Sequence, residues 1–103
     1  MGVSKMKKEQ IANRNGRQYA EGKIDFQGSN TFGEWYGSCY AVYSYGYHFP
    51  IFAFVQQQGW FENTDKYSIS TSKHQSQMKP NVSRTKKVDT KPLKDIIWKY
   101  GGK

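Results

Sequence analysis

A segment of thirty-nine residues without a lysine or arginine, residues 24–62, constrains most strongly what this chain can fold into. The sequence has sixteen basic residues, of which six precede the segment and ten follow it. Thirteen of the seventeen aromatic residues lie inside it. Lysine and arginine are rarely buried, whereas aromatic rings supply much of the area that a core removes from water. The segment is therefore predicted to be the folding nucleus, with a cationic stretch on each side.

The length of 103 residues predicts a single domain. We expect residues 1–23 to be a basic arm outside a domain of residues 24–103. The lone Cys39 excludes an internal disulfide and a multi-cysteine zinc site. The spacing of Cys39, His48 and His74 matches no zinc signature. We predict no metal, no cofactor and no catalytic residue.

Residues 31–62 have the pattern of a strand meander. Aromatic and β-branched residues alternate with short turn-forming groups, which predicts strands near residues 32–36, 39–45, 47–55 and 60–63. In the third strand, simple alternation places Ile51 and Ala53 on one face and Phe52 on the other. Pro50 cannot donate a ladder hydrogen bond, so we expect it at an edge, a bulge or a strand start. A fifth strand is predicted at residues 67–71, where apolar residues and Thr71 alternate with serines.

The C-terminal residues predict a short helix over residues 92–100, after a basic linker of residues 78–91. Pro92 suits the first helical turn, and Gly101 suits the end. A single apolar stripe lies between them, made of Leu93, Ile96, Ile97 and Tyr100. Because so short a helix is marginal alone, it must pack on the sheet. The predicted fold class is α+β: a small antiparallel sheet of four or five strands with the C-terminal helix on one face.

The net charge of +8 at pH 7 favours an anionic partner. We expect DNA or RNA, a host protein or nucleoprotein complex that handles nucleic acid, or an acidic protein surface. A membrane is not expected, because no stretch approaches the roughly 18 apolar residues that span one. The charged residues at the start of the sequence are not followed by the apolar run of a signal peptide, so the expected location is the cytoplasm.

The densest polar cluster, residues 72–77, contains Lys73 and His74. It could position a phosphate, with Lys73 supplying the charge. It could instead make structural hydrogen bonds, or carry acid/base catalysis on a nucleic acid through His74. The sequence leaves these three alternatives open.

A second candidate region surrounds the start of the predicted helix. Cations there do not favour the helix dipole, which supports contact with phosphates or carboxylates. Trp98 lies off the apolar stripe near Lys94 and could contact a partner or a nucleobase. The predicted partner- or nucleic-acid-binding residues are Lys73, His74, Arg84, Lys86, Lys87, Lys91, Lys94 and Trp98.

Four short motifs lie between residues 32 and 77: F-x-E-W-x-G at 32–37, Y-x-V-Y-S-Y-G-x-H-x-P-I at 40–51, W-x-x-N-x-D-K-Y-S at 60–68 and T-S-K-H-x-S-Q at 71–77. This part of the chain resembles a family of small uncharacterised proteins encoded by bacteriophages and plasmids. The resemblance implies a viral or mobile-element accessory protein in the cytoplasm of a bacterial host cell.

By analogy with such accessory proteins, the resemblance implies a non-enzymatic protein that binds and inhibits a host nucleic-acid-handling complex. An anti-CRISPR inhibitor is the most specific version of this hypothesis. The alternatives are a direct DNA- or RNA-binding module and a small nuclease centred on His74.

Overall fold

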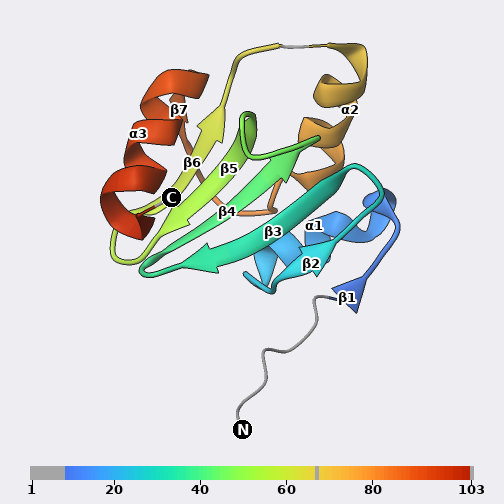
Figure 1. The fold of residues 1–103 in the computed structure, drawn as a ribbon, viewed down its shortest axis with the longest axis horizontal. Helices are drawn as coiled ribbons and strands as arrows, with labels where there is room; N and C mark the ends of the chain where they lie inside the picture. Colours follow the sequence, from blue (N-terminus) through green and yellow to red (C-terminus); the bar gives the residue numbers. More distant parts are fainter. Residues whose placement is uncertain (1–8, 67, 103) are drawn as a thin grey trace, which may run out of the picture.

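The computed structural model describes residues 9–66 and 68–102. They form a seven-stranded mixed sheet with helices on both faces (Figure 1). The strands lie in the sheet in sequence order, from β1 to β7. The α+β class with a C-terminal helix on the sheet is confirmed. The predicted antiparallel sheet of four or five strands is too small, because the flanking segments add strands at both edges.

Four antiparallel strands form the middle of the sheet: β3 (Thr31–Tyr36), β4 (Cys39–Ser44), β5 (Pro50–Val55) and β6 (Gly59–Asn63). Three of them match the predicted strands to within one residue at each end. The third begins at Pro50 instead of residue 47, because residues 45–49 form the connection from β4. Pro50 is thus at a strand start, one of the positions expected for a residue without an N–H.

The register of β4 and β5 shifts beside Pro50. Val42 pairs with Phe52 and Tyr43 pairs with Pro50, so Ile51 is an extra residue on β5. Ile51 and Phe52 therefore belong to the same core, while Ala53 belongs to the core on the other face. The alternation predicted for this strand is wrong at Ile51 because of this bulge.

Short parallel strands form both edges of the sheet. β1 (Glu9–Gln10) pairs parallel with β2 (Phe26–Gln27), and β7 (Lys86–Val88) pairs parallel with β6. β2 then pairs antiparallel with β3. Parallel neighbours need a crossover connection, and both crossovers here contain helices.

The first crossover contains the 3-10 helix η1 (Asn13–Asn15) and helix α1 (Gly16–Glu21). This corrects the prediction that residues 1–23 are an arm: within the described part, residues 9–10 form an edge strand of the sheet, residues 13–21 form η1 and α1, and Ala20 is fully buried. Residues 1–8 lie outside the described residues.

The second crossover contains α2 (Ile69–Met78), where a fifth strand was predicted. That prediction is wrong because Ser68 caps a helix: its side chain accepts a hydrogen bond from the Thr71 N–H at 3.1 Å. Tyr67, also assigned to that strand, lies outside the described residues. The predicted linker of residues 78–91 contains β7.

Both faces of the sheet are covered, which explains why the central strands are apolar on both faces. α1 and α2 cover one face, over a core that includes Tyr40, Phe52 and Met78. α3 (Thr90–Gly101) covers the other, over a core that includes Tyr43 and Leu93. Figure 1 shows α3 across the sheet from α1 and α2. The predicted C-terminal helix is confirmed and begins two residues earlier than expected.

Within residues 9–66 and 68–102, no helix has the length and apolar character to cross a membrane.

Candidate functional site

His74 lies at the centre of a hydrogen-bonded cluster that joins α2 to the sheet and to η1. The residue is only 5% exposed. Its Nδ1 lies 2.7 Å from Ser44 Oγ at the end of β4, and its Nε2 lies 3.5 Å from Asn13 Nδ2 in η1. Asn13 Oδ1 in turn accepts a hydrogen bond from Thr31 Oγ1 at 2.8 Å. Of the three alternatives for His74, this geometry favours the structural one.

The same contacts indicate which ring nitrogen carries the proton. Because Asn13 Oδ1 accepts from Thr31, the amide nitrogen faces the ring and donates to His74 Nε2. The proton of the neutral ring is then on Nδ1, which donates to Ser44 Oγ. Burial and, secondarily, the Lys73 charge lower the pKa of His74, which keeps the ring neutral near pH 7.

A hollow of about 520 Å³ opens beside His74. Two exposed cations line it, Arg14 from η1 and Lys73 from α2. We call it the cationic hollow. Its other lining residues are Ala12, Asn13, Ser29, Asn30, Tyr45, Ser70, His74 and Gln77. None of the described residues that line it is acidic, and its volume is within the range of about 300–1,000 Å³ common for ligand sites.

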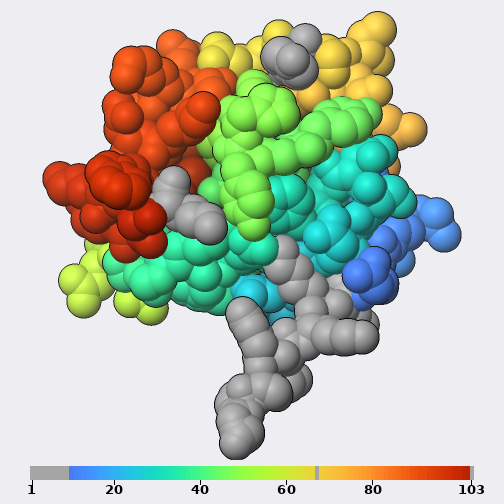
Figure 2. Space-filling view, viewed as in Figure 1, coloured from blue at the N-terminus to red at the C-terminus, as the bar shows by residue number. Residues whose placement is uncertain are grey.

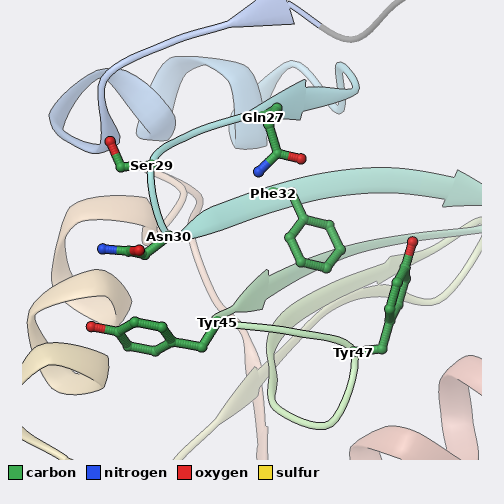
Figure 3. Close-up of a pocket in the computed structure, with 6 residues that line it drawn as sticks. All are labelled: Gln27, Ser29, Asn30, Phe32, Tyr45 and Tyr47. Atoms are coloured by element: carbon green, nitrogen blue, oxygen red, sulfur yellow. The ribbon is translucent and has the colours of Figure 1, made fainter.

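A smaller hollow of about 250 Å³ adjoins the cationic hollow. Gln27, Phe32 and Tyr47 line it, and we call it the aromatic hollow. Ser29, Asn30 and Tyr45 line both hollows. In Figure 3, Tyr45 and Asn30 point toward α2, while Phe32 and Tyr47 lie on the other side. Tyr45 and Asn30 therefore form the wall between the two hollows.

Tyr45 and Tyr47 both belong to the β4–β5 connection, residues 45–49. Figure 2 shows this connection at the surface, between α3 and α2. Tyr45 is 51% exposed and Tyr47 is 50% exposed. One side of the Tyr45 ring lies against His74, with 5.3 Å between the ring centroids. The connection thus presents Tyr45 to solvent beside Arg14 and Lys73, and Tyr47 to solvent in the aromatic hollow.

The structure brings only two of the predicted binding residues, Lys73 and His74, into this site. Arg84 is exposed in the connection between α2 and β7. Lys86 Nζ donates to Gln58 O at 2.7 Å and lies 5.1 Å from the centre of the Phe61 ring. Lys86 therefore helps to hold the edge strand as well as facing solvent.

Lys87 lies on the same edge strand, and its Nζ is 3.7 Å from Glu62 Oε1. The other predicted residues, Lys91, Lys94 and Trp98, are on α3, across the sheet from the cationic hollow. Lys91 lies 3.9 Å from Asp95, and Trp98 is 67% exposed, as expected from its place off the apolar stripe. No Lys94–Trp98 cation–π contact occurs among the described residues. The eight predicted residues do not form one surface.

Sequence reasoning missed Arg14, Asn30 and Tyr45. Arg14 was assigned to the arm, Asn30 lay before the first predicted strand, and Tyr45 was the last residue of the predicted strand 39–45. One sequence signal could have identified Tyr45: a large aromatic residue occupies a turn next to Gly46, where a small residue is usual.

No group of three or more His, Cys, Asp or Glu side chains that could hold a metal occurs in the part of the chain that the structure describes. Cys39 is buried in the core under α3, and burial raises the pKa of its thiol to about 11. The thiol is therefore protonated near pH 7.

Comparison with known proteins adds no functional information. A scan against protein-family models, a search of curated proteins and a search of solved structures each gave no match. The resemblance of residues 32–77 to small bacteriophage and plasmid proteins stays a prediction.

Proposed function

We propose that this protein is a non-enzymatic binding protein whose cationic hollow holds the phosphates of a nucleic acid. The observation that carries the proposal is that Arg14 and Lys73 line the same hollow, which no described carboxylate lines. Two cations without an acidic neighbour favour an anion at that place. The hydroxyl groups of Ser29 and Ser70 and the amide of Asn30 also line the hollow and can donate hydrogen bonds to phosphate oxygens.

Two acidic side chains near α3 and β7 support this proposal because their partners are groups of the protein itself. Asp65 accepts a hydrogen bond from the Thr90 N–H at 2.9 Å, at the start of α3. Glu62 lies 3.6 Å from Lys79 and 3.7 Å from Lys87. These two carboxylates therefore cap or neutralise local groups, and neither lines the cationic hollow with Arg14 and Lys73.

An acidic protein surface is the competing partner for a cationic site. The exposed Tyr45 beside Arg14 and Lys73 favours nucleic acid, because cations together with aromatic rings are the usual means of holding a strand. The biological role that we propose rests on the resemblance: binding would interfere with a host nucleic-acid-handling complex, of which a CRISPR effector is one example.

The first test is a titration of the purified protein with fluorescently labelled DNA and RNA between roughly 50 and 200 mM salt. The logarithm of the affinity should fall linearly with the logarithm of the salt concentration. Arg14→Glu and Lys73→Glu should each reduce the slope by about 1 or more, since each removes a phosphate contact.

Lys99→Glu is the matched control, because it makes the same charge change on α3. It should leave the slope nearly unchanged. Equal losses in all three variants would mean that net charge alone governs binding, and the cationic hollow would then have no special role. Absence of binding to either nucleic acid would refute the proposed function.

Two further measurements address the alternatives. In a pull-down from bacterial lysate, a partner that is retained after nuclease treatment would support contact with a host protein instead of its nucleic acid. If the protein cuts labelled strands and His74→Ala lowers the rate of cutting about 100-fold or more, the nuclease alternative replaces this proposal.

A further inference from the structure

We propose that the two hollows together form a binding site for single-stranded nucleic acid. The strand would cross the wall between them, with a phosphate between Arg14 and Lys73 and with bases against the exposed rings of Tyr45 and Tyr47. This inference rests on the proposed function and adds to it the form of nucleic acid that is bound.

The first argument is continuity. The two hollows share three lining residues, Ser29, Asn30 and Tyr45. A ligand that occupies both hollows would therefore need to cross only these side chains. Arg14 and Lys73 line only the cationic hollow, whereas Phe32 and Tyr47 line only the aromatic hollow. Figure 3 shows Phe32 and Tyr47 on the side of Tyr45 and Asn30 that faces away from α2. A nucleotide has the same division into an anionic part and a flat aromatic part.

The second argument is the backbone of Tyr45. Its φ is +70°, in the left-handed region that bulky residues rarely adopt. Its N–H donates to Asn30 O at 2.7 Å, which holds this conformation. Glycine or asparagine would occupy the position with less strain. Tyr45 is half-exposed and belongs to neither core, so core packing does not explain its strained backbone, and such strain is common at binding sites.

The third argument is the support of Tyr47. Its ring packs edge-on against Phe32 at 5.0 Å and against Tyr43 at 5.2 Å, measured between centroids. Its hydroxyl donates to Glu34 Oε1 at 3.0 Å. A ring held in this way loses little entropy when a base stacks on it.

These features favour a single strand over a duplex. The faces of paired bases are covered by their neighbours in a duplex, whereas an unpaired base can lie flat on a tyrosine ring. Because every base has such a face, the site should tolerate many sequences.

The test compares one labelled oligonucleotide, single-stranded and annealed to its complement, at fixed salt. The wild-type protein should bind the single strand at least about tenfold more tightly. Tyr45→Asn should lower the single-strand affinity by about tenfold, with little change in the duplex affinity or in the salt slope. Tyr45→Phe keeps the ring and should bind like the wild type.

Tyr45→Asn also separates binding from folding, since asparagine suits the left-handed backbone. Its melting temperature should be equal to or above that of the wild type. If the wild type binds single strand and duplex equally and Tyr45→Asn has no effect, the inference fails, while the proposed function stands as long as Arg14→Glu and Lys73→Glu weaken binding. If neither form of nucleic acid binds, both fail.

Discussion

Among the polar residues of the fold, we expect substitution of Asn63, at the end of β6, to lower the free energy of unfolding most. Its side chain is 2% exposed and joins three segments. Nδ2 donates to Pro50 O at 2.8 Å and to Thr90 Oγ1 at 2.9 Å, while Oδ1 accepts from the Asp65 N–H at 2.8 Å. One amide therefore connects the start of β5, the first turn of α3 and the loop that leads to α2.

We predict that Asn63→Ala lowers the free energy of unfolding by about 2–4 kcal/mol. The buried Pro50 carbonyl loses a donor that water cannot replace, which costs about 1–3 kcal/mol. Asp65 and Thr90 are partly exposed, so water compensates them in part, at about 0.5–1.5 kcal/mol for the two. Such a loss is a large fraction of the roughly 5–15 kcal/mol expected for a domain.

Urea unfolding measures this change directly. With a slope of about 2 kcal/mol/M, the middle of the usual range, the midpoint should fall by about 1–2 M while the slope stays constant. Thr64→Ala, at the exposed neighbouring residue, should change the unfolding free energy by no more than about 0.5 kcal/mol. If Asn63→Ala is as mild as Thr64→Ala, the three hydrogen bonds do not hold these segments together and the reasoning is refuted.

Three other predictions concern the helices. Because the folded state lowers the pKa of His74, the contribution of this residue to stability should be constant above about pH 6.5 and should be lost as the pH falls from there through the folded pKa. Thermal melts from about pH 8 to 5 should show this loss for the wild type, and the His74→Gln variant should lack it. Gly16→Ala places a methyl group against the Sδ of fully buried Met78 and should cost about 1–3 kcal/mol. The Gly16→Ala, Met78→Ala double variant should lose less stability than the sum of the two single losses, and full additivity would contradict this contact. Leu93→Ala should cost about 2–5 kcal/mol in urea unfolding, while Trp98→Ala on the same helix should cost less than about 0.5 kcal/mol, and similar losses would contradict the docking of α3.

The middle of the sheet and α3 were predictable because their signals are local. Turn residues separate the aromatic strands, and the stripe through Leu93 and Ile97 identifies the buried side of α3. α2 was not predictable in this way. Its buried residues are Thr71, His74, Gln75 and Met78, three of which are polar, so no apolar stripe marks the helix.

The edge strands were not predictable for a different reason. β1 has two residues and β7 has three, too few for a period-2 pattern, and both pair with strands that lie far along the chain. The cationic hollow depends on the same crossovers. Arg14 and Lys73 are 59 positions apart in sequence, and only the packing of η1 against α2 brings them to one place. The sequence carries no local sign of that contact.

The placement of the hollows has a consequence for how the molecule opens. The strands β3 to β6 follow one another through short connections, so they can form a cooperative unit from contacts that are near in sequence. η1 and α2 pack on one face of this unit, and their crossovers come from opposite edges of the sheet. The cationic hollow lies where η1 and α2 meet. A partial opening that releases either crossover would separate Arg14 from Lys73 while the central strands persist. A ligand that contacts both residues would oppose that opening, and amide hydrogen exchange in α1 and α2 should slow in its presence more than exchange in β4 and β5.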